Sequence, residues 1–220
     1  MGLISVATIV LCMVAWQTNN VHAFLASIDS HFYPRGGVGV TEFCRDDDRP
    51  FPIVAKEEEI MYPKSHGTSE KPVQKDLLYG MDFETADRIC NFNRRYAEYK
   101  GYCTNFLNFL ERKAQEEESR SNSQGLAPFT TRFYDSVTGN LLFTAPIGRT
   151  VQEFVAESKE HGWPSFRDAE VNWEYLRCLE GHEEECVSIT GTHLGHNIPD
   201  EKGNRYCINL VSIAGRPPES

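Results

Sequence analysis

The spacing of hydrophobic positions changes near Pro128, from a helical pattern before it to a β pattern after it. Apolar and small residues recur every three or four positions over residues 83–99 and again over residues 105–115, which predicts two helices. The polar stretch at residues 116–125 predicts a flexible linker. Residues 24–80 are rich in Gly, Pro and charge without sustained periodicity, so we expect an extended segment there.

Short β-branched and aromatic runs, separated by turn residues, dominate the second half of the chain. Residues 129–134 and 141–144 predict a β-hairpin, and Thr150 with Glu153 forms the signature of a capping box that opens a short helix. The remaining expected elements are strands at residues 171–179, 186–190 and 205–214 and a loop at residues 193–196. Together these elements predict a mainly β, α+β fold with one good core.

The chain begins with an apolar run at residues 3–16, followed by a polar stretch and the tripeptide Val21-His-Ala23. The run is short for a membrane span and a small residue stands at the expected cleavage point. Residues 1–23 therefore predict a secretory signal peptide, with an uncleaved anchor as the alternative. No later run approaches membrane-spanning length. We expect a protein that is secreted or lies in the lumen of the secretory pathway.

Acidic residues outnumber basic ones by 32 to 22, which gives a formal net charge of −10. This balance opposes binding to nucleic acid or to an anionic membrane surface. We expect neither of these partners, and we expect a monomer.

Six of the seven cysteines lie after the predicted signal peptide, and an even number in a secreted chain predicts disulfides. Cys178 and Cys186 flank a short hairpin turn, which makes them a candidate pair. Cys90 and Cys103 bracket one predicted helix and its cap and could pair likewise. Cys207 is either a reactive thiol or one more half of a disulfide.

The last predicted strand carries the clearest candidate chemistry. Side chains alternate between the two faces of a strand, so Arg205, Cys207 and Asn209 should point the same way. The guanidinium favours the thiolate, because a nearby opposite charge stabilises the ionised form. His193 and His196 precede this strand and offer imidazoles that exchange protons near neutral pH. These residues predict a thiol active site.

Each of these residues also has an ordinary structural interpretation. Arg205 could pair with a surface carboxylate, and Asn209 could make a structural hydrogen bond. The pair His193 and His196 could only hydrogen-bond its loop, or could form part of a metal site with a cysteine. Trp163, taken alone, would be a core tryptophan.

Three motifs carry a family resemblance: Gly162-Trp-Pro-Ser-Phe166, His193-Leu-Gly-His196 followed by a Pro-Asp turn, and Arg205-Tyr-Cys-Ile-Asn209. In this order the chain resembles the B-type methionine-(R)-sulfoxide reductases over residues 129–215, and residues 95–102 resemble the segment that closes over the fold of that family. The resemblance implies two antiparallel sheets with helices on the N-terminal side. The domain boundaries that follow are a signal peptide at residues 1–23, an extended segment at 24–80, a helical segment and linker at 81–127, and the reductase-like domain at 128–216.

The resemblance also assigns roles to individual residues. Cys207 would attack the sulfoxide sulfur and become a sulfenic acid, while His193 and His196 would hold the sulfoxide oxygen. Trp163 would form the hydrophobic wall that receives the methyl group. Phe166 would lie beside it, as a substrate contact or as support for the loop. The implied substrate is an oxidised protein or peptide.

Two departures from the family pattern change what we expect. Many members bind a structural zinc through two Cys-x-x-Cys pairs, and this chain has no Cys-x-x-Cys, so we expect no zinc of that kind and no bound cofactor. Where other members place a resolving cysteine, this chain has His161. The sulfenic acid must then be resolved by Cys44, Cys90, Cys103, Cys178 or Cys186, or by an external thiol. Cys44 is the first candidate, because it is left over if the other four form the two candidate disulfides, and we expect an external thioredoxin-like dithiol reductant to be required for turnover. The alternative function is a secreted, non-catalytic domain in which Cys207 is held in a disulfide.

Overall fold

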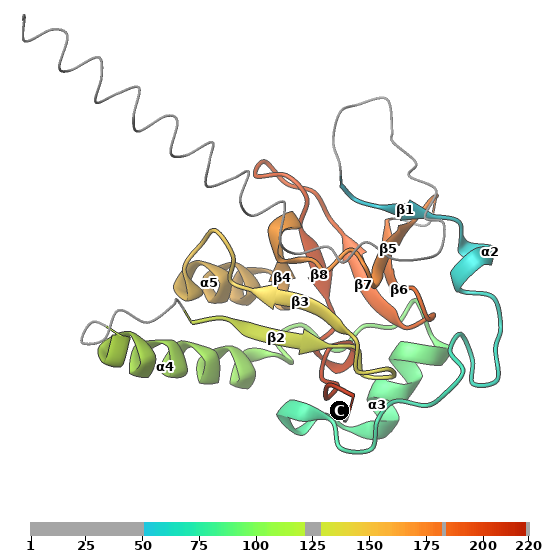
Figure 1. Cartoon of the computed structure of the whole chain (residues 1–220), viewed down its shortest axis with the longest axis horizontal. Coiled ribbons are helices and arrows are strands. Elements are labelled where there is room, and N and C mark those ends of the chain that lie inside the picture. The colour runs from blue at the N-terminus through green and yellow to red at the C-terminus, as the bar shows by residue number, and fades with distance from the viewer. Residues whose placement is uncertain (1–50, 122–128, 182–183, 219–220) are drawn as a thin grey trace, which may run out of the picture. The chain divides into compact units, whose positions relative to one another are not determined.

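A six-stranded sheet and a two-stranded hairpin form the β part of the protein (Figure 1). The structure is a computed structural model that describes residues 51–121, 129–181 and 184–218. The larger sheet has the strand order β1-β5-β6-β7-β8-β4, and β2 pairs with β3. The strands are β1 (Val54–Ala55), β2 (Thr131–Tyr134), β3 (Leu141–Ala145), β4 (Ser165–Phe166), β5 (Leu176–Leu179), β6 (Glu185–Ser188), β7 (His193–Asn197) and β8 (Tyr206–Ile208).

The helices lie around these strands, and α4 packs against α5 beside the hairpin (Figure 1). Side chains from both helices, the hairpin and the larger sheet share one hydrophobic core, with Phe133, Phe154 and Phe166 among its fully buried members. The helices are α2 (Glu57–Ile60), α3 (Phe83–Asp87), α4 (Thr104–Ser121) and α5 (Val151–His161). None of the helices in the described part of the chain is long and apolar enough to cross a membrane.

Several local predictions are confirmed. β2 and β3 form the antiparallel hairpin, with Phe133 opposite Phe143. The capping box at Thr150 and Glu153 is present and opens α5, which runs on to His161. The mixed structure is consistent with a mainly β fold class. The larger sheet is not wholly antiparallel, however, because β1 runs parallel to β5.

The helix predicted at residues 83–99 is much shorter than its spacing suggests. The Asp82 side chain accepts a hydrogen bond from the Thr85 amide and starts α3. The helix continues as one π-helical turn over Arg88–Phe92, and Asn93 has non-helical backbone angles. Residues 94–98 therefore leave the helix and become available for the site described below.

The strand predicted at residues 205–214 ends early, and the predicted loop at residues 193–196 is instead a strand. β8 stops at Ile208 because the amides of Leu210 and Val211 donate to a carboxylate rather than to a neighbouring strand. β7 pairs with β6 on one side and β8 on the other. Gly195 permits this approach, since a Cβ there would lie 2.1 Å from the Cys207 carbonyl oxygen.

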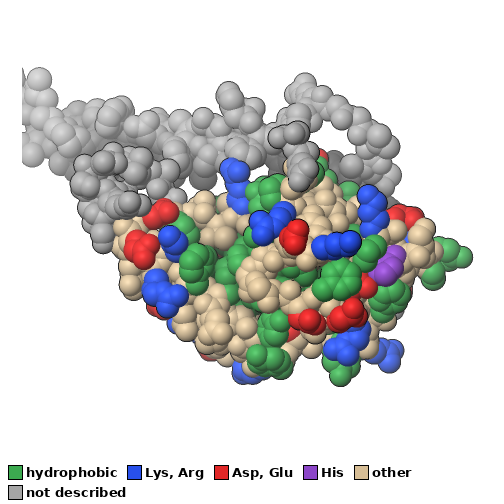
Figure 2. Space-filling model, turned by 90° about the horizontal axis from the view of Figure 1, so that it is seen from below, with side chains coloured by type: hydrophobic (Ala, Val, Ile, Leu, Met, Phe, Trp, Pro, Cys, Tyr) green, Lys and Arg blue, Asp and Glu red, His purple; other side chains and the backbone are tan. Residues whose placement is uncertain are grey.

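The strand predicted at residues 171–179 is likewise shortened. The Asn172 side chain donates to the Leu141 carbonyl, and regular pairing begins only at Leu176. The predicted signal peptide and residues 24–50 of the extended segment lie outside the described residues. On the face drawn in Figure 2, Lys and Arg side chains are interspersed with Asp and Glu rather than gathered in a patch of one sign.

Candidate active site

Cys207 lies on β8, between β7 and β4 in the larger sheet. Its neighbours Tyr206 and Ile208 are fully buried, whereas Cys207 is partly exposed. This is the alternation that a short strand produces. The other four cysteines of the described residues are buried, so Cys207 is the described thiol that a dissolved substrate can reach.

The sheet register places an imidazole beside this thiol. His196 of β7 is the direct cross-strand partner of Cys207, and directly opposed residues project from the same face of a sheet. The rings of His193 and His196 have their centroids 5.7 Å apart. Backbone pairing therefore brings His196 beside Cys207, and His193 lies next to His196.

A cavity of about 200 Å³ lies beside these residues. Trp163 and Asn209 also line it, so five of the residues predicted from the sequence meet at one place. The remaining lining residues are Arg94, Arg95, Tyr96, Ala97, Gly195 and Ile198. The site thus combines a thiol, two imidazoles and an apolar wall.

Burial and charge act in opposite directions on Cys207. Burial raises the pKa of its thiol, and the nearby Arg205 guanidinium lowers it through its charge and a hydrogen bond. Burial has the larger effect, so the net pKa is above its ordinary value. Arg205 is therefore needed to favour the thiolate, although it does not itself line the cavity.

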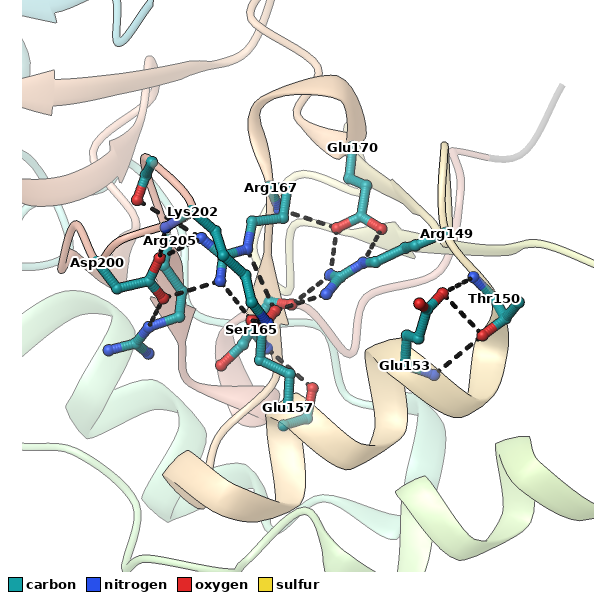
Figure 3. A network of polar contacts seen from close by, with 12 residues as sticks. Arg149, Thr150, Glu153, Glu157, Ser165, Arg167, Glu170, Asp200, Lys202 and Arg205 are labelled. Atoms are coloured by element: carbon teal, nitrogen blue, oxygen red, sulfur yellow. Dashed lines mark hydrogen bonds and ion pairs between the residues drawn. The ribbon is translucent and has the colours of Figure 1, made fainter.

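Arg205 is held in place by a network of ion pairs (Figure 3). Its Nε atom lies 3.4 Å from Asp200 Oδ2, and the residue is only 6% exposed. Arg167 donates to both carboxylate oxygens of Asp200 at 2.9 and 2.8 Å. These bonds lower the pKa of Asp200 to about 2. Arg205 thus contacts both the Asp200 carboxylate and the Cys207 thiol. The two interpretations left open by the sequence, a pair with a carboxylate and stabilisation of the thiolate, therefore hold together.

His193 is oriented by a carboxylate that the sequence did not single out. Its Nδ1 atom lies 2.7 Å from Glu185 Oε1, with both side chains buried. Glu185 also accepts hydrogen bonds from Arg94. Burial alone would raise the pKa of Glu185, but the bonds from His193 and Arg94 lower it overall. Because Nδ1 is occupied, Nε2 of His193 is the atom available to a ligand.

Asn209 and Trp163 share a second partner that sequence reasoning missed, Glu98. Asn209 Oδ1 accepts a hydrogen bond from the Glu98 amide at 3.2 Å, and its Nδ2 donates to the Leu194 carbonyl. Trp163 Nε1 donates to the Glu98 carbonyl at 3.1 Å. These contacts fix the indole ring and the amide at the edge of the cavity.

Phe166 does not line the cavity. It is fully buried and stacks on Phe143, with ring centroids 4.1 Å apart. Phe166 is therefore not placed where it would contact a substrate in the cavity. It fits the other predicted role, in which it supports the site from the core. Its position on β4, one residue after the partner of Cys207, explains why it turns into the core.

The candidate disulfides have different outcomes. Cys178 and Cys186 are direct cross-strand partners, and their sulfur atoms lie 3.6 Å apart as free thiols. Cys90 donates to Ser212 and Cys103 donates to the Gly162 carbonyl, in separate hydrophobic clusters. The structure thus places the first pair in register and does not bring the second pair together.

The predicted resolving thiol, Cys44, lies outside the described residues. Among the described residues, no group of three or more His, Cys, Asp or Glu side chains is arranged to hold a metal ion. His193 and His196 instead face the thiol and the cavity.

Comparison with known proteins identifies a family relationship. No protein-family model matches the chain, and no solved structure matches it. The chain is similar to the peptide methionine sulfoxide reductase MsrB of Methanosarcina mazei, with 32% identity over 98 residues. The match covers 39% of this chain and 68% of that protein. On this likeness the chain belongs to the MsrB family of peptide methionine sulfoxide reductases.

Proposed function

We propose that this protein reduces the R epimer of methionine sulfoxide in peptides or proteins, with Cys207 as the nucleophile. The observation that carries the proposal is the partly exposed thiol in a cavity with an apolar wall and two imidazoles. The family relationship supports sulfoxide reduction as the reaction. The preference for the R epimer and for polypeptide substrates rests on the resemblance of the three motifs.

In the proposed reaction the Cys207 thiolate attacks the sulfoxide sulfur. The attack forms a transient bond between the two sulfur atoms. The oxygen is then transferred to Cys207 as this bond and the substrate's sulfur–oxygen bond break, which releases methionine and leaves a sulfenic acid on Cys207. The oxygen needs a proton as it departs from the substrate, and His193 or His196 supplies it. Arg205 favours the attacking thiolate, and Trp163 provides the apolar contact for the methyl group.

The sulfenic acid must then be reduced before another turnover. An external dithiol does this by forming a mixed disulfide with Cys207 and releasing water, after which its second thiol frees Cys207. The role of Cys44 as the resolving thiol stays a prediction from the sequence. So does the location of the protein in the secretory pathway or outside the cell.

The test is reduction of N-acetylmethionine sulfoxide, with the two epimers assayed separately and dithiothreitol as reductant. The wild-type protein should reduce the R epimer, and Cys207→Ser should be inactive. Cys90→Ala is the matched control, because Cys90 is buried outside the cavity and bonds to Ser212. Equal rates for wild type and Cys207→Ser would refute the proposal.

A further inference from the structure

Residues 94–98, here called the strap, run along the cavity and are fixed at both ends by buried groups. At one end Arg94 pairs with Glu185, the carboxylate that orients His193. At the other end Glu98 is only 4% exposed. The three residues between them are exposed and line the cavity. The strap therefore links the histidine side of the site to the cysteine side.

Glu98 makes four hydrogen bonds that converge on the site. Its carboxylate accepts the amides of Leu210 at 2.8 Å and Val211 at 3.0 Å, just beyond β8. Its own amide donates to Asn209, and its carbonyl accepts the indole N–H of Trp163. Glu98 thus fixes three parts of the site together. These are the end of β8, the side-chain amide of Asn209 and the indole of Trp163.

We propose that Glu98 is a positioning residue for sulfoxide reduction, an inference that rests on the function proposed for Cys207. It holds Trp163 and Asn209 at the cavity, and its carboxylate opposes ionisation of the nearby thiol. The first effect follows from the hydrogen bonds of the Glu98 backbone, and the second follows from the negative charge of its side chain.

The charge distinguishes Glu98 from a residue with a structural role alone. Burial raises the pKa of Cys207, Arg205 lowers it, and the Glu98 carboxylate raises it. Burial raises the pKa of Glu98 itself to about 7, although its two backbone donors lower it. The other titratable side chains that sense the Glu98 charge are Cys90, Tyr102 and Cys103.

The test compares two reactions of the same thiol in Glu98→Gln, a change that removes the charge and nearly preserves the shape. One reaction is alkylation of Cys207 by iodoacetamide as a function of pH, followed by peptide mapping. The other is reduction of N-acetylmethionine sulfoxide with dithiothreitol. The exposed Glu84 provides the matched control, Glu84→Gln.

We expect the two rates to move in opposite directions in Glu98→Gln. Alkylation at pH 7 should become about threefold faster, because a like charge near the thiol is gone. Sulfoxide reduction should fall about tenfold in kcat/KM, mainly through KM, because a glutamine cannot accept from both backbone amides and the strap loosens. Unchanged rates, or rates that move together, would overturn the proposal.

A second variant keeps the test decisive if Glu98→Gln does not fold, as judged by circular dichroism. Trp163→Phe keeps an aromatic apolar wall of smaller size and removes the hydrogen bond to the Glu98 carbonyl. It should raise KM several-fold and leave the pH profile of Cys207 alkylation unchanged; an unchanged KM would overturn the proposal. If wild type reduces no sulfoxide, the proposed function fails, while the alkylation profile of a folded Glu98 variant still tests the charge effect.

Discussion

Replacing Arg205 by methionine should make Cys207 a much poorer nucleophile at neutral pH. The variant keeps most of the buried volume and removes the positive charge beside the thiol. Burial already raises the pKa of Cys207, and Arg205 is the cation that opposes this effect. Without the cation the pKa should rise further, so less thiolate remains at pH 7.

The size of the effect follows from the proximity of the two groups. A hydrogen-bonded opposite charge commonly moves a pKa by about one unit or more, and each unit reduces the thiolate fraction about tenfold below the pKa. Asp200 keeps its two hydrogen bonds from Arg167 in the variant, so it is not left unpaired. We therefore expect alkylation of Cys207 at pH 7 to slow by about tenfold or more, with little loss of stability.

The assay is the rate of iodoacetamide alkylation of Cys207 between pH 6 and 11, with each labelled peptide quantified by mass spectrometry. The variant should approach the wild-type rate at high pH, where both thiols are ionised. Arg132→Met is the control, because Arg132 is an exposed arginine on β2. A profile that is unchanged, or shifted to lower pH, would refute the assignment of Arg205 as the group that stabilises the thiolate.

Three further variants or treatments test the surroundings of the site. Glu185→Gln should lower the free energy of unfolding by about 3 kcal/mol at pH 7, because it breaks the ion pair of this buried carboxylate with Arg94 and weakens its hydrogen bond with His193. The pKa of Glu185 is lowered in the folded protein, so this difference should shrink in urea titrations as the pH falls towards and below 4.5. Phe166→Ala should cost about 3–5 kcal/mol in the same titrations, and a loss below about 1 kcal/mol would contradict its place in the core. Mild oxidation should join Cys178 to Cys186, which peptide mapping detects; a cross-link to a different cysteine would contradict the register of β5 and β6.

Part of the site could be predicted from the sequence because it follows a local rule. Alternation along a short strand puts Arg205, just before β8, on the same side as Cys207, whereas the pairing that brings His196 opposite the thiol was missed because residues 193–196 were expected to form a loop. The hairpin and the Thr150 capping box depend on neighbouring residues and were predictable for the same reason. Patterns of this kind are short, so each is complete within a few positions of the sequence.

The carboxylates that support the site could not be found in this way. Glu98 bonds to amides more than 110 positions away in the chain, and nothing in its local pattern marks it as different from a surface glutamate. Glu185 stood at the edge of a polar turn, where the usual interpretation is a solvated charge. The early end of β8 could not be predicted for the same reason, because it is caused by the distant Glu98 side chain.

The site is therefore held by two kinds of interaction that respond differently to pH. Backbone pairing positions Cys207 and His196 and contains no titrating group. Glu185 and Asp200 have lowered pKa values, so their ion pairs persist well below neutral pH. Glu98 has a pKa near 7, and its charge changes in the range where the enzyme would work. Of these three supporting carboxylates, Glu98 is thus the one whose charge changes with a small shift of pH near neutrality. Through that charge the shift would alter the ionisation of the Cys207 thiol.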